Sequence, residues 1–376
     1  MPKVAKKIAR PPAKARPAKP APKPVVAPKP VVAPKPVIEP EFVDSSFKPQ
    51  VGRASRVPID QGGVVVVGSL NMDVVVRAEV MPAPGQTVMG HDLMQNPGGK
   101  GANQATAAGK LSKKGKHAVT RMVGRVGDDA FGIKMIAALQ NAGVETGSVV
   151  TTKNTPSGTA LIIVDRHGEN SIVVAGGANS RLTAADLLAQ RKAIEASRVL
   201  AVQLESPFDA VACAIAIAKQ AGVLTILDPA PAPLDGLPES LFHVDILSPN
   251  QTEAQLITGI TVRNVDDARR AGEKMLARGT GMVVLKMGSS GAVIVQRDEK
   301  GAITHKHVLG FKVPVVDTTA AGDSFTGALA VALAEGLPIE QAVRFANAAG
   351  ALACTKPGAA SAIPTRAQVE ALIAGI

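Results

Sequence analysis

The sequence predicts an α/β protein with three α/β/α layers: a mostly parallel central sheet covered by helices on both faces, and a small β-sheet that serves as a lid. Two observations predict this class. Short apolar runs alternate with amphipathic helical stretches along most of the chain, which is typical of parallel sheets. Two segments rich in strand-forming residues, 72–97 and 155–179, interrupt the alternation, and we expect them to form the separate small sheet.

Residues 1–60 differ in composition from the rest of the chain. They are rich in Lys, Pro, Ala and Val and contain the repeat KPVVAPKPVVAPKPVIEP. Closely spaced prolines disfavour helix and sheet, so we expect a disordered basic tail. Residues 1–40 hold ten Lys or Arg and one acid, which account for +9 of the net charge of +11. A weak tether to nucleic acid or another anionic surface, or a transit peptide, are alternative readings of this tail.

The composition of the remaining chain, residues 61–376, narrows the function classes. It is nearly neutral, and it has no apolar run long enough to predict a membrane span. Cys213 and Cys354 are far apart and lack metal-ligand spacing, which indicates a reducing compartment, so we expect a cytoplasmic protein. Trp and Tyr are absent, which argues against base-stacking surfaces for nucleic acid.

The expected central sheet begins at the apolar run VVVVGSL, which starts at Val64. Further runs of this kind follow at residues 197–206, 222–231, 244–250 and 282–291, with helical stretches such as 209–221 and 265–279 between them. Ligands of parallel sheets bind beyond the carboxyl ends of the strands. The polar or small residues that close these runs are therefore candidates for a site: Glu205, Asp228, Asn250 and Gly288.

The expected lid contains a hairpin. In residues 155–179, the turn sequence RHGEN separates two apolar runs. A small sheet near the carboxyl ends of the main strands would exclude water from a bound ligand.

The stretch DTTAAGDSF, residues 317–325, carries the strongest chemical signal. We expect a strand over FKVPVV before it and a helix over SFTGALAVALAEG after it. The small residues at the turn would leave backbone N–H groups open at a helix N-terminus, which suits phosphate oxygens. Asp323 lies in the same turn, either as a base that takes a proton from an attacking hydroxyl or as an ordinary helix cap.

Three further motifs bring polar groups to strand ends. In NPGGKGANQA, Lys100 and Asn103 follow a glycine turn and could bind a polyhydroxylated ligand, or the motif is a turn with a solvated lysine. In GSLNMD, Asn71 and Asp73 share one side of an extended chain, although such a pair is more often part of a turn. In SPNQTE, the Asn250 and Glu253 pair suits Mg²⁺, or starts a helix.

Taken together, these motifs resemble the PfkB-type family of carbohydrate kinases. The resemblance covers residues 62–376 and rests on motifs that occur in the family's order: GSLNMD, NPGGKGANQA, VQLESP, LDPAPA, SPNQTEA, GSSGA, DTTAAGDSFTGAL and KPGAASAIP. It implies a ribokinase-like fold and transfer of phosphate from ATP to O5 of D-ribose.

The resemblance also implies roles for individual residues. Asp323 corresponds to the catalytic base, and the N–H groups of Ala320, Ala321 and Gly322 to the anion hole. The positions implied to contact the sugar are Asn71, Asp73, Gly99, Lys100, Asn103, Glu205 and Asp323. Those implied to hold ATP are Asn250, Glu253, Lys286, Gly288, Ser289, Gly291, Gly322 and Asn347, with Asn250 and Glu253 near Mg²⁺. Those implied to bind a monovalent cation, K⁺, are Asp317, Thr319, Ala353, Lys356 and Gly358.

Three positions depart from the family pattern. Ala362 stands at a cation position that is often serine, which weakens the expectation of potassium activation. Asp228 stands where asparagine is frequent, and Lys286 replaces a small polar residue near the nucleotide. That lysine would pair with phosphates or point outward.

The sequence leaves alternatives to ribose phosphorylation. Deoxyribokinase, fructokinase and adenosine kinase activities are compatible with the same architecture. A nucleic-acid-associated protein that acts through its basic tail is the alternative from a different class. The family further suggests a homodimer that forms through the lid.

Overall fold

The computed structural model describes residues 62–113 and 119–376. Their main feature is a nine-stranded sheet in the order β13-β12-β11-β10-β9-β8-β1-β4-β5. The strands are β1 (Val64–Val67), β4 (Thr120–Gly127), β5 (Val144–Thr152), β8 (Val199–Val202), β9 (Leu224–Leu227), β10 (Ile246–Leu247), β11 (Met282–Lys286), β12 (Ala292–Arg297) and β13 (Ile303–Val308). The predicted tail falls outside the described residues.

The sheet is parallel from β5 to β11, and β12 and β13 add an antiparallel edge. Helices connect the strands: α1 (Lys100–Leu111), α2 (Ala130–Asn141), α3 (Ala184–Ala189), α4 (Arg191–Glu195), α5 (Phe208–Ala221), α6 (Gln251–Thr258), α7 (Val265–Leu276), α8 (Ala321–Ala334), α9 (Ile339–Ala353) and α10 (Arg366–Ala374). Three short 3₁₀ helices lie at Gly177–Arg181, Glu239–Phe242 and Gly288–Ser290. This mostly parallel α/β arrangement confirms the predicted fold class.

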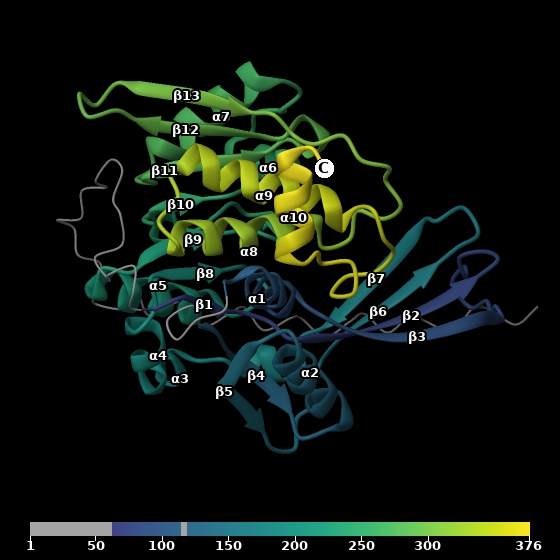
Figure 1. The fold of residues 1–376 in the computed structure, drawn as a ribbon. Helices are drawn as coiled ribbons and strands as arrows, with labels where there is room; N and C mark the ends of the chain where they lie inside the picture. Colours follow the sequence, from purple (N-terminus) through teal and green to yellow (C-terminus); the bar gives the residue numbers. More distant parts are fainter. Residues whose placement is uncertain (1–61, 114–118) are drawn as a thin grey trace, which may run out of the picture. The chain divides into compact units, whose positions relative to one another are not determined.

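Alternation along β1 shows how the helices cover both faces of the sheet. Val64 and Val66 belong to a core that contains α1, α8 and α9, whereas Val65 and Val67 belong to a second core that contains α5 and α7. Figure 1 shows α8 and α9 in yellow on one side of the strands. A strand buried on both faces reads as an uninterrupted apolar run, as VVVV does.

The second sheet contains four strands in the order β3-β2-β6-β7. These are β2 (Asn71–Ala78), β3 (Gly90–Gly98), β6 (Gly158–Val164) and β7 (Asn170–Ala175), and they extend to one side of the main sheet (Figure 1). The predicted hairpin is confirmed, because β6 and β7 are antiparallel and the N–H of Asp165 donates to the carbonyl of Glu169.

One expected strand is absent from the described structure. Residues 311–316 have no strand pairing and enter α8 as an irregular segment. Pro314 has no N–H to give to a ladder, and the N–H groups of Val316 and Asp317 donate instead to the carbonyl of Cys354. The prediction was wrong because an apolar run does not reveal which partner its backbone will find.

Among the helices of the described residues, none is long and apolar enough to cross a membrane.

Candidate active site

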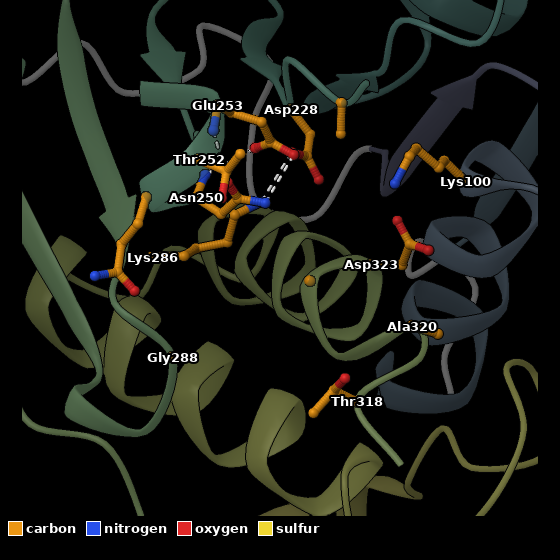
Figure 2. Close-up of a pocket in the computed structure, with 13 residues that line it drawn as sticks. Lys100, Asp228, Asn250, Thr252, Glu253, Lys286, Gly288, Thr318, Ala320 and Asp323 are labelled. Carbon is orange, nitrogen blue, oxygen red and sulfur yellow. Dashed lines mark hydrogen bonds and ion pairs between the residues drawn. The ribbon is translucent and has the colours of Figure 1, made fainter. Parts of the chain in front are cut away.

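A pocket of about 370 Å³ lies at the carboxyl ends of β9, β10 and β11, where it meets the start of α8 (Figure 2). Eight of the residues that line it are positions to which the family resemblance assigned a role: Lys100, Asn250, Glu253, Lys286, Gly288, Ala320, Gly322 and Asp323. The other lining residues are Asp228, Ala230, Gln251, Thr252 and Thr318. Segments that are far apart in the sequence therefore meet at the edge of the sheet where ligands of parallel α/β folds bind.

The first turn of α8 opens toward this pocket. Ala320 has φ 58°, in the left-handed region, and no side chain caps the helix. The N–H of Ala321 makes a long bond of 3.3 Å to the carbonyl of Thr318. In the described part of the chain, the N–H groups of Gly322 and Asp323 have no acceptor. Unpaired amides at a helix N-terminus attract anions.

Asp323 is buried beside these amides and accepts two hydrogen bonds. Asn103 donates to one carboxylate oxygen at 3.0 Å, and Gln104 donates to the other at 3.3 Å. Burial raises the pKa of Asp323 above its ordinary value, the nearby ammonium of Lys100 opposes this, and the carboxylate of Asp228 adds to it. Figure 2 shows Lys100 and Asp323 at the same end of the pocket.

Lys100 is held in its charged form. Burial lowers the pKa of its ammonium, but the surrounding carboxylates, of which Asp323 has the largest effect, outweigh burial and raise the pKa overall. Its backbone N–H, the first of α1, donates to Glu205 at 3.0 Å. Lys100 thus contributes a positive charge that acts on both Asp323 and Glu205.

Glu205 follows β8 and gathers the polar groups of the GSLNMD motif. Its Oε2 accepts from the hydroxyl of Ser69 at 2.6 Å and from the amide of Asn71 at 3.4 Å. Asn179, at the end of the second lid segment, donates to the side-chain oxygen of Asn71 at 2.8 Å. Neither Ser69 nor Asn179 was singled out from the sequence; Asn179 gave a signal only as the polar residue that closes the lid segment.

Asp73 lies on β2 close to this cluster. Burial raises its pKa to about 7, and the carboxylates of Glu205 and Asp323 add to the effect. A Cβ at Gly98 would lie 2.3 Å from a carboxylate oxygen of Asp73, and one at Gly99 would lie 2.6 Å from the backbone nitrogen of Asn71. Glycine at these two positions allows the lid strands and the start of α1 to pack closely.

Known proteins resemble this chain over most of the residues that form the fold and the pocket. The model for the pfkB family of carbohydrate kinases matches residues 61–366. A ribokinase of Haemophilus influenzae is 39% identical over 303 residues, which are 81% of this chain and 95% of that protein.

This chain belongs to the pfkB family of carbohydrate kinases.

Two other relatives of the kinase illustrate the range of the family. A structure of Arabidopsis thaliana ribokinase complexed with ribose and ATP matches with a TM-score of 0.75 and 34% identity, over 83% of this chain and 99% of that one. A deoxyribokinase of Salmonella typhi is 32% identical over 302 residues, which are 80% of this chain and 95% of that protein.

At the start of α6, the kinase uses its N-x-x-E pair as a reciprocal cap. The side-chain oxygen of Asn250 accepts from the N–H of Glu253 at 2.8 Å, and Glu253 accepts from the N–H of Asn250 at 2.7 Å and from its side-chain amide at 2.9 Å. Burial raises the pKa of Glu253, Lys286 opposes this and Asp228 adds to it. The reading of the pair as a helix start is confirmed, and both side chains also line the pocket.

The other residues expected to hold the nucleotide are more dispersed. Gly288 lines the pocket, and Ser289 follows it in the same short 3₁₀ helix. Gly291, with φ 96°, closes the turn before β12. The Asn347 amide donates to the carbonyls of Val308 and Leu309 at 3.0 and 3.2 Å. In this structure Asn347 thus holds the segment that follows β13.

The expected cation-binding segments lie against each other. Asp317 accepts from the N–H of Thr319 and from the N–H of Gly358, both at 2.8 Å. Within the described residues, no group of three or more His, Cys, Asp or Glu side chains is arranged to hold a metal. Ala353 is the last residue of α9, and Lys356 lies with Gly358 in the loop that follows this helix.

Sequence reasoning named Asp228 as a candidate at a strand end and as a departure from the family pattern, but it missed Gln104 as a site residue. Gln104 donates to Asp228 at 3.0 Å as well as to Asp323. Asp228 also accepts from Lys286 at 2.8 Å and from the hydroxyl of Thr326 at 2.9 Å. The signal for Gln104 was its place in the GANQA motif, one residue after Asn103.

Proposed function

We propose that this protein is an ATP-dependent ribokinase that transfers the γ-phosphoryl group of ATP to O5 of D-ribose. The observation that carries the proposal is the meeting of a buried carboxylate, Asp323, with unpaired amides at the start of α8. A substrate hydroxyl needs a group that accepts its proton, whereas a phosphate chain needs groups that donate hydrogen bonds. The first turn of α8 supplies both. The ribokinase relatives, one of which was solved with ribose and ATP, support this substrate pair.

Asp323 is the proposed base. A carboxylate whose pKa is raised by burial binds a proton more tightly, which favours its taking one from the sugar hydroxyl as that oxygen attacks phosphorus. Asn103 and Gln104 hold the carboxylate in one orientation by donating to its two oxygens. The carboxylate would deliver the proton to water after the product leaves.

The sugar would lie between the lid and α1. The proposed hydrogen-bonding groups for its hydroxyls come from both sides of this space: Asn71, Asp73, Gly99, Lys100, Asn103 and Glu205. Their acceptor-rich character suits a polyol, since carboxylates and amide oxygens accept from hydroxyl groups.

The phosphate chain would approach the start of α8. The N–H groups of Ala320, Ala321 and Gly322 form the proposed anion hole, in which charge spread over the phosphoryl oxygens meets fixed donors. Asn250, Glu253 and Gly288 line the same pocket, and Ser289, Gly291 and Asn347 complete the proposed nucleotide region.

Mg²⁺ would lie near Asn250 and Glu253, because one or two carboxylates together with substrate phosphates are the usual ligands of such a site. When bound, Mg²⁺ would neutralise charge on the phosphate oxygens. K⁺ would bind beside the anion hole at Asp317, Thr319, Ala353, Lys356 and Gly358, and would order the turn that precedes α8.

A homodimer through the lid is part of the proposal. Exposed apolar side chains occur on both faces of the small sheet, and include Leu93, Leu161, Ile172, Val173 and Val174. Apolar surface on a projecting sheet is a frequent sign of an interface. Sedimentation of the purified protein would test this, and a monomer at micromolar concentration would remove the dimer from the account.

The test of the substrate is a coupled ADP-release assay across pentoses, hexoses and nucleosides, each with and without K⁺. We expect the highest kcat/KM for ribose, and faster turnover with K⁺ than with Na⁺. A preference for deoxyribose, fructose or adenosine would assign one of the alternatives. The Salmonella typhi relative makes deoxyribose the closest competitor.

A role for the basic tail in nucleic-acid contact, and a cytoplasmic location, complete the proposal. The tail's contribution rests on the +9 charge of residues 1–40. Retention on DNA that falls with salt and disappears when residues 1–60 are deleted would support the contact. Equal retention of both proteins would contradict it.

A further inference from the structure

A buried ion pair lies at the phosphate side of the pocket. Lys286 ends β11 and Asp228 follows β9, so the pair spans the carboxyl end of β10, which lies between them. The distance from Nζ to the carboxylate oxygen is 2.8 Å, and the side chains are 11% and 2% exposed. Burying such a pair gives little net stability relative to neutral residues, so its presence calls for a functional reason.

The Lys286 ammonium faces the start of α8. It lines the pocket, and a Cβ placed on Gly322 would lie 3.9 Å from its Nζ, with no other contact within 4 Å. The N–H of Gly322 has no acceptor among the described residues. An ammonium and the positive end of a helix therefore border the same space, which makes that space favourable for an anion.

Asp228 links this ammonium to the proposed base. One of its oxygens accepts from Lys286, and the other accepts from Gln104 and from Thr326. The same Gln104 nitrogen donates to Asp323 at 3.3 Å, and the Gln104 oxygen accepts from Gln203 at 2.5 Å. Asp228 thus fixes Lys286 on one side and the amide that orients Asp323 on the other.

We propose that Lys286 binds a β- or γ-phosphoryl oxygen of the nucleoside triphosphate, and that Asp228 is the positioning residue that aims it. The proposal rests on the kinase function and sharpens it, since it assigns the phosphate end of ATP to a residue that replaces the small polar one of the family pattern. We expect asparagine in place of Asp228 and a small polar residue in place of Lys286 to occur together in relatives. A change at only one of the two positions would leave the other buried charge without its partner.

The experiment compares four proteins: the full-length wild type, Lys286→Met, Asp228→Asn and the double variant. Titration calorimetry with Mg²⁺ gives the Kd of each for a non-hydrolysable ATP analogue, ADP and AMP, and steady-state assays give kcat and KM for ATP and ribose. A charge-assisted hydrogen bond contributes about 1.5–3 kcal/mol, which corresponds to about 10- to 100-fold in affinity. We expect Lys286→Met to weaken the ATP analogue by about that factor, to change AMP affinity by less than about threefold and to leave the KM for ribose unchanged.

The double variant separates phosphate binding from a purely structural ion pair. If Lys286 contacts phosphate, affinity for the ATP analogue stays at least about tenfold below wild type although the uncompensated carboxylate is gone. If Lys286 and Asp228 only neutralise each other's charge, the double variant recovers wild-type affinity for the ATP analogue, which would overturn the proposal. The double variant also keeps the test decisive if Lys286→Met alone does not fold. Lys286→Arg keeps the positive charge and should recover most of the affinity for the ATP analogue.

Asp228→Asn tests the link from Asp228 to the proposed base through the pH profile of kcat. The groups that act on the Asp323 carboxyl are Lys100 on α1 and Asp228, with Asp73 on β2 also within electrostatic reach. Because the charge of Asp228 raises the pKa of Asp323, its removal should move the acidic limb of the profile to lower pH. An unmoved limb would contradict the electrostatic link between Asp228 and Asp323. Should wild type not phosphorylate ribose at all, the proposed substrate itself fails, whereas an active wild type with an unaffected Lys286→Met removes only this inference.

Discussion

Two helices begin at the same pocket, and they begin differently. The first turn of α6 is closed by its own side chains, since Asn250 and Glu253 satisfy each other's backbone N–H groups. The first turn of α8 starts at Ala320 with no side-chain cap, and the N–H groups of Gly322 and Asp323 have no acceptor in the described structure. Both starts are formed by short polar motifs that look like ordinary helix beginnings in the sequence.

The difference separates stability from function. A reciprocal cap stabilises its helix by about 1 kcal/mol, and the α6 start keeps that contribution. The start of α8 lacks this contribution, and Ala320 has a left-handed backbone conformation there. Such a conformation costs free energy and is found mainly at functional sites, where ligand binding makes use of it. We infer that α6 supports the pocket and that α8 carries out the chemistry within it.

The largest expected effect concerns the carboxylate of the open helix start. Asp323→Asn should lower kcat by about 10²- to 10⁴-fold, the usual contribution of a general base, with the fold intact. Asp209→Asn, an exposed change in the first turn of α5, is the control and should keep full activity. Wild-type turnover in Asp323→Asn would remove the base.

A methyl group at the open amides is expected to have the next largest effect. Gly322→Ala meets no backbone, because its nearest neighbour would be the Lys286 ammonium at 3.9 Å, so the protein should fold normally. The methyl would displace the phosphate by about 1 Å, which costs about 100-fold in kcat/KM for ATP. Gly147→Ala, where a Cβ meets nothing within 4 Å, is the matched control. Equal kinetics for the two variants would show that phosphate does not reach this turn.

Asp73, on the proposed sugar side of the site, should make the stability of the protein depend on pH. The folded-state pKa of Asp73 is raised from 3.8 to about 7, so the folded protein binds more protons than the unfolded chain between these values. Stability of the ligand-free protein should therefore fall as pH rises from about 4 to about 7. Asp323 and Glu253, with raised pKa values, act in the same direction.

Asp73→Asn isolates the contribution of this one group. The difference in thermal midpoint between pH 5 and pH 8 should become smaller in the variant, while the remaining acids keep part of it. A variant whose midpoint depends on pH as steeply as that of wild type would show that Asp73 titrates normally.

The smallest effect is expected at the closed helix start. Asn250→Ala should reduce the free energy of unfolding by about 1 kcal/mol, measured by urea denaturation, because it removes the acceptor for the N–H of Glu253. The comparison predicts opposite profiles for the two helices, with a stability loss at α6 and an activity loss at α8. A Gly322→Ala variant that loses as much stability as Asn250→Ala would erase the distinction.

The fold and the centre of the site were predictable because their signals are local. The apolar runs VVVV and MVVLK predict buried strands. The glycine and alanines of DTTAAGDSF predict a helix start with open backbone N–H groups. The resemblance supplied the roles that local patterns left undecided, such as base against cap at Asp323.

Contacts between distant residues were not predictable. Gln104 and Asp228 are 124 positions apart, and nothing in either segment indicates that one amide joins two carboxylates. Residues 311–316 looked like a strand because they are apolar, yet Val316 and Asp317 donate to Cys354, 38 and 37 positions later along the chain. A one-dimensional pattern gives the kind of environment a residue needs, but the fold decides which partner provides it.

The most direct test of the central claim is a crystal structure of the full-length protein with ribose, MgADP and aluminium fluoride, which mimics the transferring phosphoryl group. The account predicts that the Asp323 carboxylate lies within hydrogen-bond distance of the ribose 5-hydroxyl, and that the fluoride lies about 2.7–3.1 Å from the N–H of Gly322. A fluoride bound away from the start of α8, or an Asp323 side chain without contact to the sugar, would contradict it.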